Sequence, residues 1–333
     1  MASLDFEIDP TGTIPAPTLP ALARQVEEAG FAGIWRGETN TRDPIALLAA
    51  CAPLTERVTL GTAVLHLFAR SPVAAGMAAA TLNALTGGRF VLGLGVANPT
   101  LARWHGGSFA RPLAMARDYL TIVRAVYAGA RVDHAGSTFR AHEFRLGGSR
   151  PEQPLRILLA ALGPRMSRLA GEQADGVMVN LGTPAAIRQI AAWMREGALA
   201  AGRDPSQLAV VVKVRVALSD DPAAARDALR PTVATYVRAP GYREHLVRSG
   251  FGEELARLEA AWEAGGFAAA VRAVDDGLLA RLPVLAVRDP AEVPPQLAAY
   301  AAAGATHIIL PLIPVGPNAA AEAHRFLAGW PRS

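Results

Sequence analysis

The stretch TLNALTGGRFVLGLGVANP, residues 81–99, decides the fold of this chain. Its first half has the composition of a helix that stops at Gly87 and Gly88, and its second half contains the apolar run RFVLGLG. Glycine accommodates the turn that ends a helix, and a short apolar run bounded by glycines is typical of a buried strand. A helix that leads through a tight turn into a buried strand is the joint expected in a parallel sheet covered by helices.

The same order of helix, turn and apolar strand recurs along the chain. It is found in EEAGFAGIW (27–35), GEQADGVMV (171–179) and AAAGATHIIL (301–310). This alternation predicts parallel βα units, which close into an α/β fold of the (β/α)8 TIM-barrel type. The expected strands are 3–8, 33–35, 57–65, 89–95, 155–160, 176–180, 208–218 and 306–312, and the expected helices are 18–29, 43–54, 72–85, 112–129, 164–173, 184–200, 290–303 and 318–329.

The length of 333 residues suits one such barrel with insertions. We expect a single domain over 1–333, with a hairpin at about 130–153 and a mostly helical insertion at about 219–285, between the seventh strand and the seventh helix. Insertions on the carboxyl side of barrel strands commonly form a wall of the substrate pocket. A helical solenoid is the alternative architecture, and the β-branched run at 208–218 counts against it.

The composition excludes several classes of protein. Hydrophobic residues make up 51% of the chain and charged residues 19%, so the chain can bury a large core. No apolar run approaches the roughly 18 residues of a membrane span, and the N-terminal MASLDFEIDPTG lacks a basic segment and an apolar signal core. We therefore expect a cytoplasmic protein with no membrane partner.

The distribution of charge, the single cysteine and the missing motifs argue against further kinds of partner and site. The net charge of +4 comes from dispersed arginines rather than from a basic stripe, which argues against a nucleic-acid partner. Cys51 lies alone in the apolar run ALLAACAPL, so we expect it to serve packing and not a disulfide or a metal. No H-E-x-x-H, C-x-x-C, P-loop or G-x-S-x-G motif is present, which argues against metal, nucleotide and serine hydrolases.

The loop after the second strand, RGETNTRDP (36–44), is the first candidate for chemistry. Asp43 before Pro44 is expected to cap the next helix. Glu38 and Asn40 fall in the loop itself and are expected at the barrel mouth, where a carboxylate can act as general acid or base. The alternative is a surface carboxylate paired with a neighbouring arginine.

Residues at the ends of the third and fourth strands suit a planar ligand. His66 follows the third strand and can bond a ligand ring or move a proton, and the alternative is a loop histidine bonded to the backbone. Gly93 and Gly95 are expected to let a planar ligand approach the backbone closely. Asn98 follows as an amide partner for a heterocycle.

Two later strand ends run into helix starts, where free N–H groups and the helix dipole favour a phosphate. An ordinary capped helix is the alternative at each of them. The residues concerned are Ala160, Ala161, Leu162 and Gly163 in the first loop and Asn180, Leu181, Gly182 and Thr183 in the second.

Two cations on the seventh strand share one face. Lys213 and Arg215 lie two residues apart, so both point into the barrel, where they would suit an anionic ligand, or both point toward the helices. His307 opens the last strand at its amino end and is expected to be structural. We expect the insertion to decide the substrate, and without a pattern that indicates a role it offers Tyr236, Arg238, Tyr242 and His245.

The ordered set EEAGFAGIW, RVTLGTAV followed by RSP, LTGGRFVLGLG, LAGEQADGVMVNLGTP and AAAGATHIIL resembles the bacterial-luciferase-like family of flavin-dependent monooxygenases and deazaflavin-dependent reductases. The resemblance covers about 3–327, and LTGGRFVLGLG is its most specific part. It implies a luciferase-like barrel with an insertion after the seventh strand. It also implies a homodimer that holds FMN or the deazaflavin coenzyme F420 across its strand ends and acts on a small-molecule substrate.

The resemblance also implies where the cofactor lies. A non-prolyl cis peptide often ends the third strand of such proteins and faces the ring, which places it near Val64, Leu65 and His66. The phosphate-bearing tail typically meets the helix starts after the fifth and sixth strands, which match 160–163 and 180–183.

The loop RGETNTRDP is similar to that of the methylene-tetrahydromethanopterin-reductase-like branch, in which an Asp-His pair precedes Asn and then Arg-Asp. Gly37 and Glu38 stand at the places of that pair. The departure leaves Glu38 as the candidate proton donor and puts the branch's own reaction in question.

We favour coenzyme F420 and hydride transfer to or from a small organic substrate. One alternative is an FMN-dependent monooxygenase served by a separate flavin reductase, and another is a barrel that binds a cofactor without catalysis. A barrel aldolase or isomerase is a further alternative. An aldolase would need a Schiff-base lysine at a strand end, and Lys213 lies within its strand.

Overall fold

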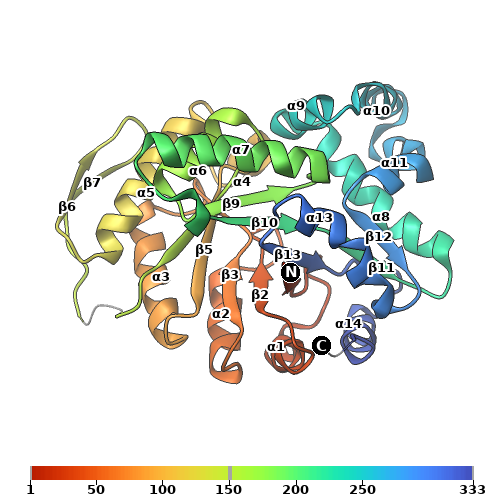
Figure 1. Cartoon of the computed structure of the whole chain (residues 1–333), viewed down its shortest axis with the longest axis horizontal. Coiled ribbons are helices and arrows are strands. Elements are labelled where there is room, and N and C mark those ends of the chain that lie inside the picture. The colour runs from red at the N-terminus through yellow and green to blue at the C-terminus, as the bar shows by residue number, and fades with distance from the viewer. Residues whose placement is uncertain (1, 149–151, 332–333) are drawn as a thin grey trace.

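The computed structural model describes residues 2–148 and 152–331. Eight parallel strands close into a barrel, because β3 pairs with both β2 and β5 and the remaining pairs follow in chain order until β13 returns to β1 (Figure 1). The predicted (β/α)8 barrel is therefore confirmed. Its strands are β1 (Ser3–Glu7), β2 (Gly33–Arg36), β3 (Thr59–Thr62), β5 (Phe90–Gly95), β8 (Arg156–Ala160), β9 (Gly176–Asn180), β10 (Ala209–Lys213) and β13 (His307–Pro311).

Helices surround the barrel at the predicted places. Most of them begin with a proline at the first helical position, where the missing N–H has no intrahelical partner to lose and the fixed φ suits the helix. They are α1 (Leu19–Glu28), α2 (Pro44–Cys51), α3 (Pro72–Leu85), α5 (Pro112–Tyr127), α6 (Pro164–Gln173), α7 (Pro184–Ala200), the short α12 (Val293–Gln296) and α13 (Ala298–Ala302), and α14 (Ala319–Ala328).

Alternate residues of each strand fill the barrel, as the two-residue period of a strand requires. The other residues of the strands pack against the helices in the larger core, with Phe6, Ile34 and Leu92 as examples. The buried apolar cluster inside the barrel comprises Trp35, Ala63, Val91, Leu158, Met178, Ala209, Val211 and Ile309. This layer closes the centre of the barrel, so a ligand has access only at its mouth.

Two predicted strands are interrupted. The third predicted strand, 57–65, breaks at a non-prolyl cis peptide between Ala63 and Val64 and resumes as β4 (Leu65–His66) beside β5. The seventh predicted strand, 208–218, divides at Val214. Its second half, β11 (Arg215–Leu218), leaves the barrel sheet and pairs with β12 (Val284–Val287).

One strand and one α-helix of the described residues were not predicted. The strand β12 begins inside the segment 219–285 that we expected to be mostly helical, so the insertion ends in a strand that pairs with β11. The short helix α4 (Pro99–Trp104) follows β5, and Asn98 caps its start.

The two insertions lie at opposite ends of the molecule (Figure 1). The predicted hairpin is formed by β6 (Val132–Ala135) and β7 (Arg140–Phe144), which pair antiparallel. The second insertion packs a hydrophobic core of its own, centred on residues such as Leu229 and Phe251. Its helices are α8 (Pro222–Val237), α9 (Pro240–Arg248), α10 (Gly252–Ala273) and α11 (Asp276–Arg281).

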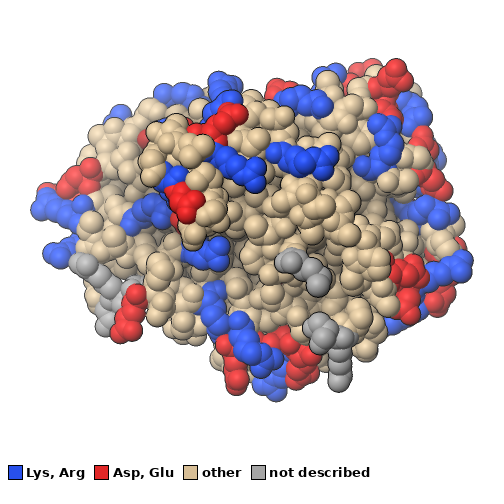
Figure 2. All heavy atoms as spheres, in the orientation of Figure 1, with Lys and Arg blue, Asp and Glu red and all other residues tan. Residues whose placement is uncertain are grey.

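The surface carries both signs of charge. Figure 2 shows acidic and basic side chains interspersed on one face, mostly toward its edges, with a largely uncharged centre. Among the helices of the described residues, none combines the length and the apolar character that crossing a bilayer requires.

The packing of Trp35 inside the barrel depends on a glycine. A Cβ placed on Gly61 of the neighbouring strand would lie 2.4 Å from the Trp35 ring. We expect Gly61→Ala to lower the free energy of unfolding by about 1–3 kcal/mol, because the barrel interior has no space for the added methyl group. Urea denaturation measures this.

The matched control is Gly241→Ala in α9, where no heavy atom lies within 4 Å of the added Cβ. We expect that change to alter the free energy of unfolding by less than about 1 kcal/mol. Equal losses in the two variants would contradict the packing role assigned to Gly61.

Candidate active site

A buried ion pair lies beneath the mouth of the barrel. The Lys213 ammonium group donates to Glu7 Oε2 at 2.7 Å and to the carbonyl oxygen of Ala63 at 2.6 Å. The other Glu7 oxygen accepts from the backbone N–H of Gly37 at 3.1 Å. Lys213 therefore points into the barrel, which settles its orientation, and its charge is already compensated by Glu7.

Glu38 lies above this pair and is buried, at 8% exposure. Its Oε2 accepts from the backbone N–H of His66 at 2.6 Å, and its Oε1 accepts from Arg70 at 3.0 Å. Arg70 also reaches Asp43, which caps α2 as predicted by accepting from the N–H of Ala46. Glu38 thus joins the loops after the second and third strands, and the arginine that pairs with it is Arg70 rather than the neighbouring ones in its own loop.

His66 is buried beside Glu38, with its Nδ1 at 3.8 Å from Glu38 Oε2. Burial, with a smaller contribution from His105, lowers the pKa of the His66 imidazole to about 4. His66 Nδ1 has no hydrogen-bond partner among the described residues. A neutral ring with an unpartnered buried nitrogen is suited to bond the polar edge of a ligand.

The glycines of β5 lie close against the end of β3, and their expected role toward a ligand stays a prediction. A Cβ on Gly93 would lie 2.0 Å from the carbonyl oxygen of Thr62, and one on Gly95 would lie 2.6 Å from the Val64 side chain. Thr62 Oγ1 also accepts from the Gly93 N–H and donates to the Gly93 carbonyl. These glycines let β5 lie close against the end of β3, so that Val64 is seated beside Ala160.

The remaining predicted residues of these loops differ in their placement. Leu65 is fully buried in the core between barrel and helices, so only its backbone is available to a ligand. Asn40 is exposed in its loop. Asn98 uses its Oδ1 to accept from the N–H groups of Thr100 and Leu101 at the start of α4. Its amide oxygen is therefore committed to a helix cap.

The two predicted phosphate loops differ in one respect. Gly163 precedes α6 and offers no side chain to cap it, so no side-chain acceptor meets the N–H groups of the first turn. Thr183 precedes α7 and caps it by accepting from the N–H of Ala186 at 3.2 Å. Ala161, Leu181 and Gly182 are buried, whereas Ala160, Leu162, Gly163, Asn180 and Thr183 are half-buried. The loop before α6 is the better place for an anion.

Helix α9 of the insertion covers both loops. His245 lies with its Nε2 at 3.1 Å from the carbonyl oxygen of Leu181, and Arg248 donates to the carbonyl oxygen of Leu162 at 2.8 Å. Burial lowers the pKa of His245. The insertion therefore forms one wall of the mouth, as expected from its position after the seventh strand.

A polar cluster that the sequence did not indicate stands between this wall and the barrel. Asn180 donates to the Tyr242 hydroxyl at 2.8 Å and accepts from Arg215 at 2.8 Å. Arg215 also reaches the Tyr236 hydroxyl at 3.5 Å, and the two tyrosine rings lie 4.3 Å apart. Arg215 thus faces the mouth on the same side as Lys213.

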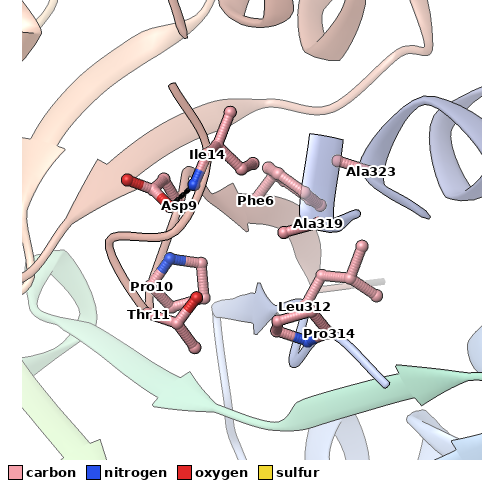
Figure 3. A pocket seen from close by; sticks show the side chains of 9 residues that line it. All are labelled: Phe6, Asp9, Pro10, Thr11, Ile14, Leu312, Pro314, Ala319 and Ala323. Atoms are coloured by element: carbon pink, nitrogen blue, oxygen red, sulfur yellow. Dashed lines mark hydrogen bonds between the residues drawn. The ribbon is translucent and has the colours of Figure 1, made fainter. Parts of the chain in front are cut away.

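A small cleft lies beside the mouth (Figure 3). It is bounded by the loop after β1, the loop after β13 and α14, and Asp9 accepts from the N–H of Ile14 at its edge. Phe6 and Leu312 belong to the core outside the barrel, so the cleft is separate from the mouth. His307 pairs with Asp5 at the opposite end of the barrel, consistent with the structural role expected for it. Within the described ranges, no group of three or more potential metal-ligating side chains is found.

Comparison with known proteins agrees with the fold. The family model of the luciferase-like monooxygenases matches residues 4–307. The chain belongs to this family. A relative from Mycobacterium tuberculosis, which bears the name "Putative coenzyme F420-dependent oxidoreductase", is 31% identical over 92% of this chain and 94% of its own length. A 5,10-methylenetetrahydromethanopterin reductase of Methanolobus tindarius is 30% identical over 70% of this chain and 72% of its own length.

Solved structures share the luciferase-like fold. The coenzyme F420-dependent tetrahydromethanopterin reductase of Methanopyrus kandleri superposes with a TM-score of 0.80 over 98% of this chain and 97% of its own, at 22% identity. An F420-dependent secondary alcohol dehydrogenase gives a TM-score of 0.79 over 99% of this chain and 98% of its own, at 17% identity.

The burial of His66 has a consequence for stability. An unfolded chain binds a proton at this histidine near pH 6.5, whereas the folded one binds it only near pH 4. The unfolded state therefore gains protons first as the pH falls, and this residue destabilises the fold progressively from about pH 6.5 to about pH 4. We expect the free energy of unfolding to fall by about 2 kcal/mol more between pH 8 and pH 5 in the wild type than in His66→Gln.

Urea denaturation at both pH values measures this difference, and an NMR titration of the His66 ring supplies a direct check. A ring that titrates near pH 6.5 in the folded protein would contradict the burial argument.

Proposed function

We propose that this protein is a coenzyme F420-dependent oxidoreductase that transfers a hydride between the deazaflavin and a small organic substrate at the barrel mouth. The observation that carries the proposal is the pairing of an apolar wall, Val64 and Ala160, with the unpartnered buried nitrogen of His66. A deazaflavin ring has an apolar face and a polar pyrimidine edge, so the residues present fit it. The two relatives described above carry names that specify coenzyme F420 or a reductase reaction.

The chain's own residues would hold the coenzyme at two places. Val64 and Ala160 would contact the ring face, and His66 would bond its polar edge. The uncapped first turn of α6, next to Gly163, would accept the phosphate of the tail. When bound, the deazaflavin supplies a carbon that accepts or gives the hydride.

Glu38 would manage the proton that accompanies hydride transfer. Its carboxylate is buried, lies next to His66 and accepts hydrogen bonds at both oxygens. Exchange of a proton at Oε1 requires Arg70 to swing toward Asp43, with which Arg70 is already bonded at 2.7 Å. Asp43 would thus hold the guanidinium group while Glu38 takes or returns the proton.

FMN-dependent oxygenation is the second candidate, because the fold is also that of monooxygenases. The monooxygenase RslO1 of Streptomyces bottropensis superposes with a TM-score of 0.68 at 19% identity. An FMN enzyme of this kind would depend on a separate flavin reductase. We also propose, on the resemblance alone, that the protein acts as a homodimer.

Titration with coenzyme F420 and with FMN separates the two candidates. We expect coenzyme F420 to bind at least about tenfold more tightly than FMN, as measured by fluorescence. Tight binding of FMN alone would favour the monooxygenase, and binding of neither would exclude both. A panel of secondary alcohols and pterin-like imines, followed by the visible absorbance of the deazaflavin, then tests for hydride transfer.

Glu38→Gln tests the proton role. The amide oxygen of glutamine still accepts from the His66 N–H but cannot exchange a proton, so we expect kcat to fall at least about 100-fold while the Kd for coenzyme F420 stays within about threefold. Stopped-flow turnover and fluorescence titration measure the two constants.

The matched control is Glu172→Gln, which removes the carboxylate partner of Arg117 at a place outside the mouth. We expect it to lower kcat less than about tenfold. Unchanged turnover in Glu38→Gln would remove this residue from the reaction.

A further inference from the structure

Arg215 is a buried cation without an acidic partner. Its side chain is 7% exposed, and its contacts in the described part of the chain are the amide oxygen of Asn180, the hydroxyl of Tyr236 and the face of the Tyr236 ring at 5.6 Å. Among the described residues, no carboxylate lies within 4 Å of it. All the groups that it touches are neutral.

Two other cations of the mouth, the buried Lys213 and the half-buried Arg70, differ in this respect. Lys213, two residues earlier, has Glu7 as its counter-ion, and Arg70 has both Glu38 and Asp43. A buried charge without a counter-ion is costly, and a guanidinium group forms its strongest bonds, two in parallel, with a carboxylate or a phosphate. A bound anion would therefore supply the counter-ion that the buried Arg215 charge lacks.

The neighbours of Arg215 have donors left for such an anion. A guanidinium group carries five N–H donors, and two contacts to protein oxygen atoms account for only part of them. Tyr236 and Tyr242 each receive a hydrogen bond at the phenol oxygen, from Arg215 and from Asn180, which leaves each O–H free to donate. Burial raises the pKa of Tyr242, so its O–H stays protonated.

Part of the cluster is accessible to solvent. Asn180, Tyr236 and Tyr242 are half-buried, whereas Arg215 is buried. Asn180 ends β9, at the carboxyl end of the barrel strands, which is the mouth where the proposed cofactor and substrate would meet. A ligand held in the mouth would therefore lie next to these donors.

We propose that Arg215, with the hydroxyl groups of Tyr236 and Tyr242, binds one anionic group, a carboxylate or a phosphate, of a molecule held in the barrel mouth. The anion has two possible sources, the substrate and the tail of the cofactor. Only this choice of source rests on the proposed function, because the anion site itself follows from the contacts of Arg215.

Inorganic phosphate is the probe that tests the site. Thermal unfolding of the whole protein is followed with increasing phosphate, at ionic strength matched with chloride. A ligand that binds only the folded state raises Tm by mass action, and we expect a rise of about 1–3 °C at concentrations well above the Kd. Arg215→Met should weaken phosphate binding at least about tenfold, since a charge-assisted pair is lost.

Two further variants keep the test informative. Arg215→Lys keeps the charge but not the planar fork, and it should retain part of the response to phosphate. Arg203→Met is the matched control, because Arg203 bonds the carbonyl oxygens of Gly171 and Ala174 at the opposite end of the barrel. It should respond to phosphate as the wild type does. Equal responses of the wild type and both Arg215 variants would overturn the proposal.

Repeating the titration with saturating coenzyme F420 identifies the source of the anion. A response to phosphate that persists points to the substrate as the anion, and one that disappears points to the tail of the coenzyme. Should coenzyme F420 fail to bind while the phosphate response still depends on Arg215, the proposed function fails and the anion site stands.

Discussion

The buried contact between Lys213 and Glu7 fixes the geometry on which the mouth of the barrel depends. Lys213 is the only lysine of the chain, and its ammonium group ties the end of β10 to the end of β1 and to the carbonyl of Ala63 after β3. Through the N–H of Gly37, Glu7 adds the end of β2. Removing either partner would leave an uncompensated charge inside the barrel. The loops that carry Glu38 and His66 therefore share one buried electrostatic anchor, which gives a physical reason for their close approach.

Local pattern was sufficient for most of the fold, because most helix-to-strand joints carry a glycine followed by an apolar run. It was insufficient at Val214, where the strand leaves the barrel sheet. The strand-like pattern of LAVVVK continues without a break into VRVAL. A period of two residues indicates which side of a sheet a residue faces, but not which strand lies beside it. The sequence left the neighbour of Gly93 undetermined for a related reason. A glycine in a strand signals a close approach, and the sequence does not reveal that the approaching group is the carbonyl of Thr62.

The candidate site shows the same limit. The position of Glu38 and His66 directly after strands was enough to predict that both lie at one end of the barrel. The hydrogen bond from the His66 backbone N–H to the Glu38 carboxylate had no signal in the sequence. Arg215 lies 21 residues before Tyr236 and 35 after Asn180, so nothing local linked them. The sequence left the direction of the Arg215 side chain open. Its place in a polar cluster follows only from the path of the insertion. Only the three-dimensional structure shows that a buried charge lacks a counter-ion.

Helix α9 makes two of its contacts with the loops beneath it through their main chain, whereas its Tyr242 bonds the side chain of Asn180. His245 and Arg248 reach the carbonyl oxygens of Leu181 and Leu162, and a carbonyl oxygen is present whichever amino acid occupies those positions. The side chains at 162 and 181 can therefore change during evolution, or in a designed library, without loss of these two contacts. At these two positions, unlike at Asn180, the loops can change their side chains and still keep their bonds to the insertion, so a new ligand preference can arise there while those bonds persist.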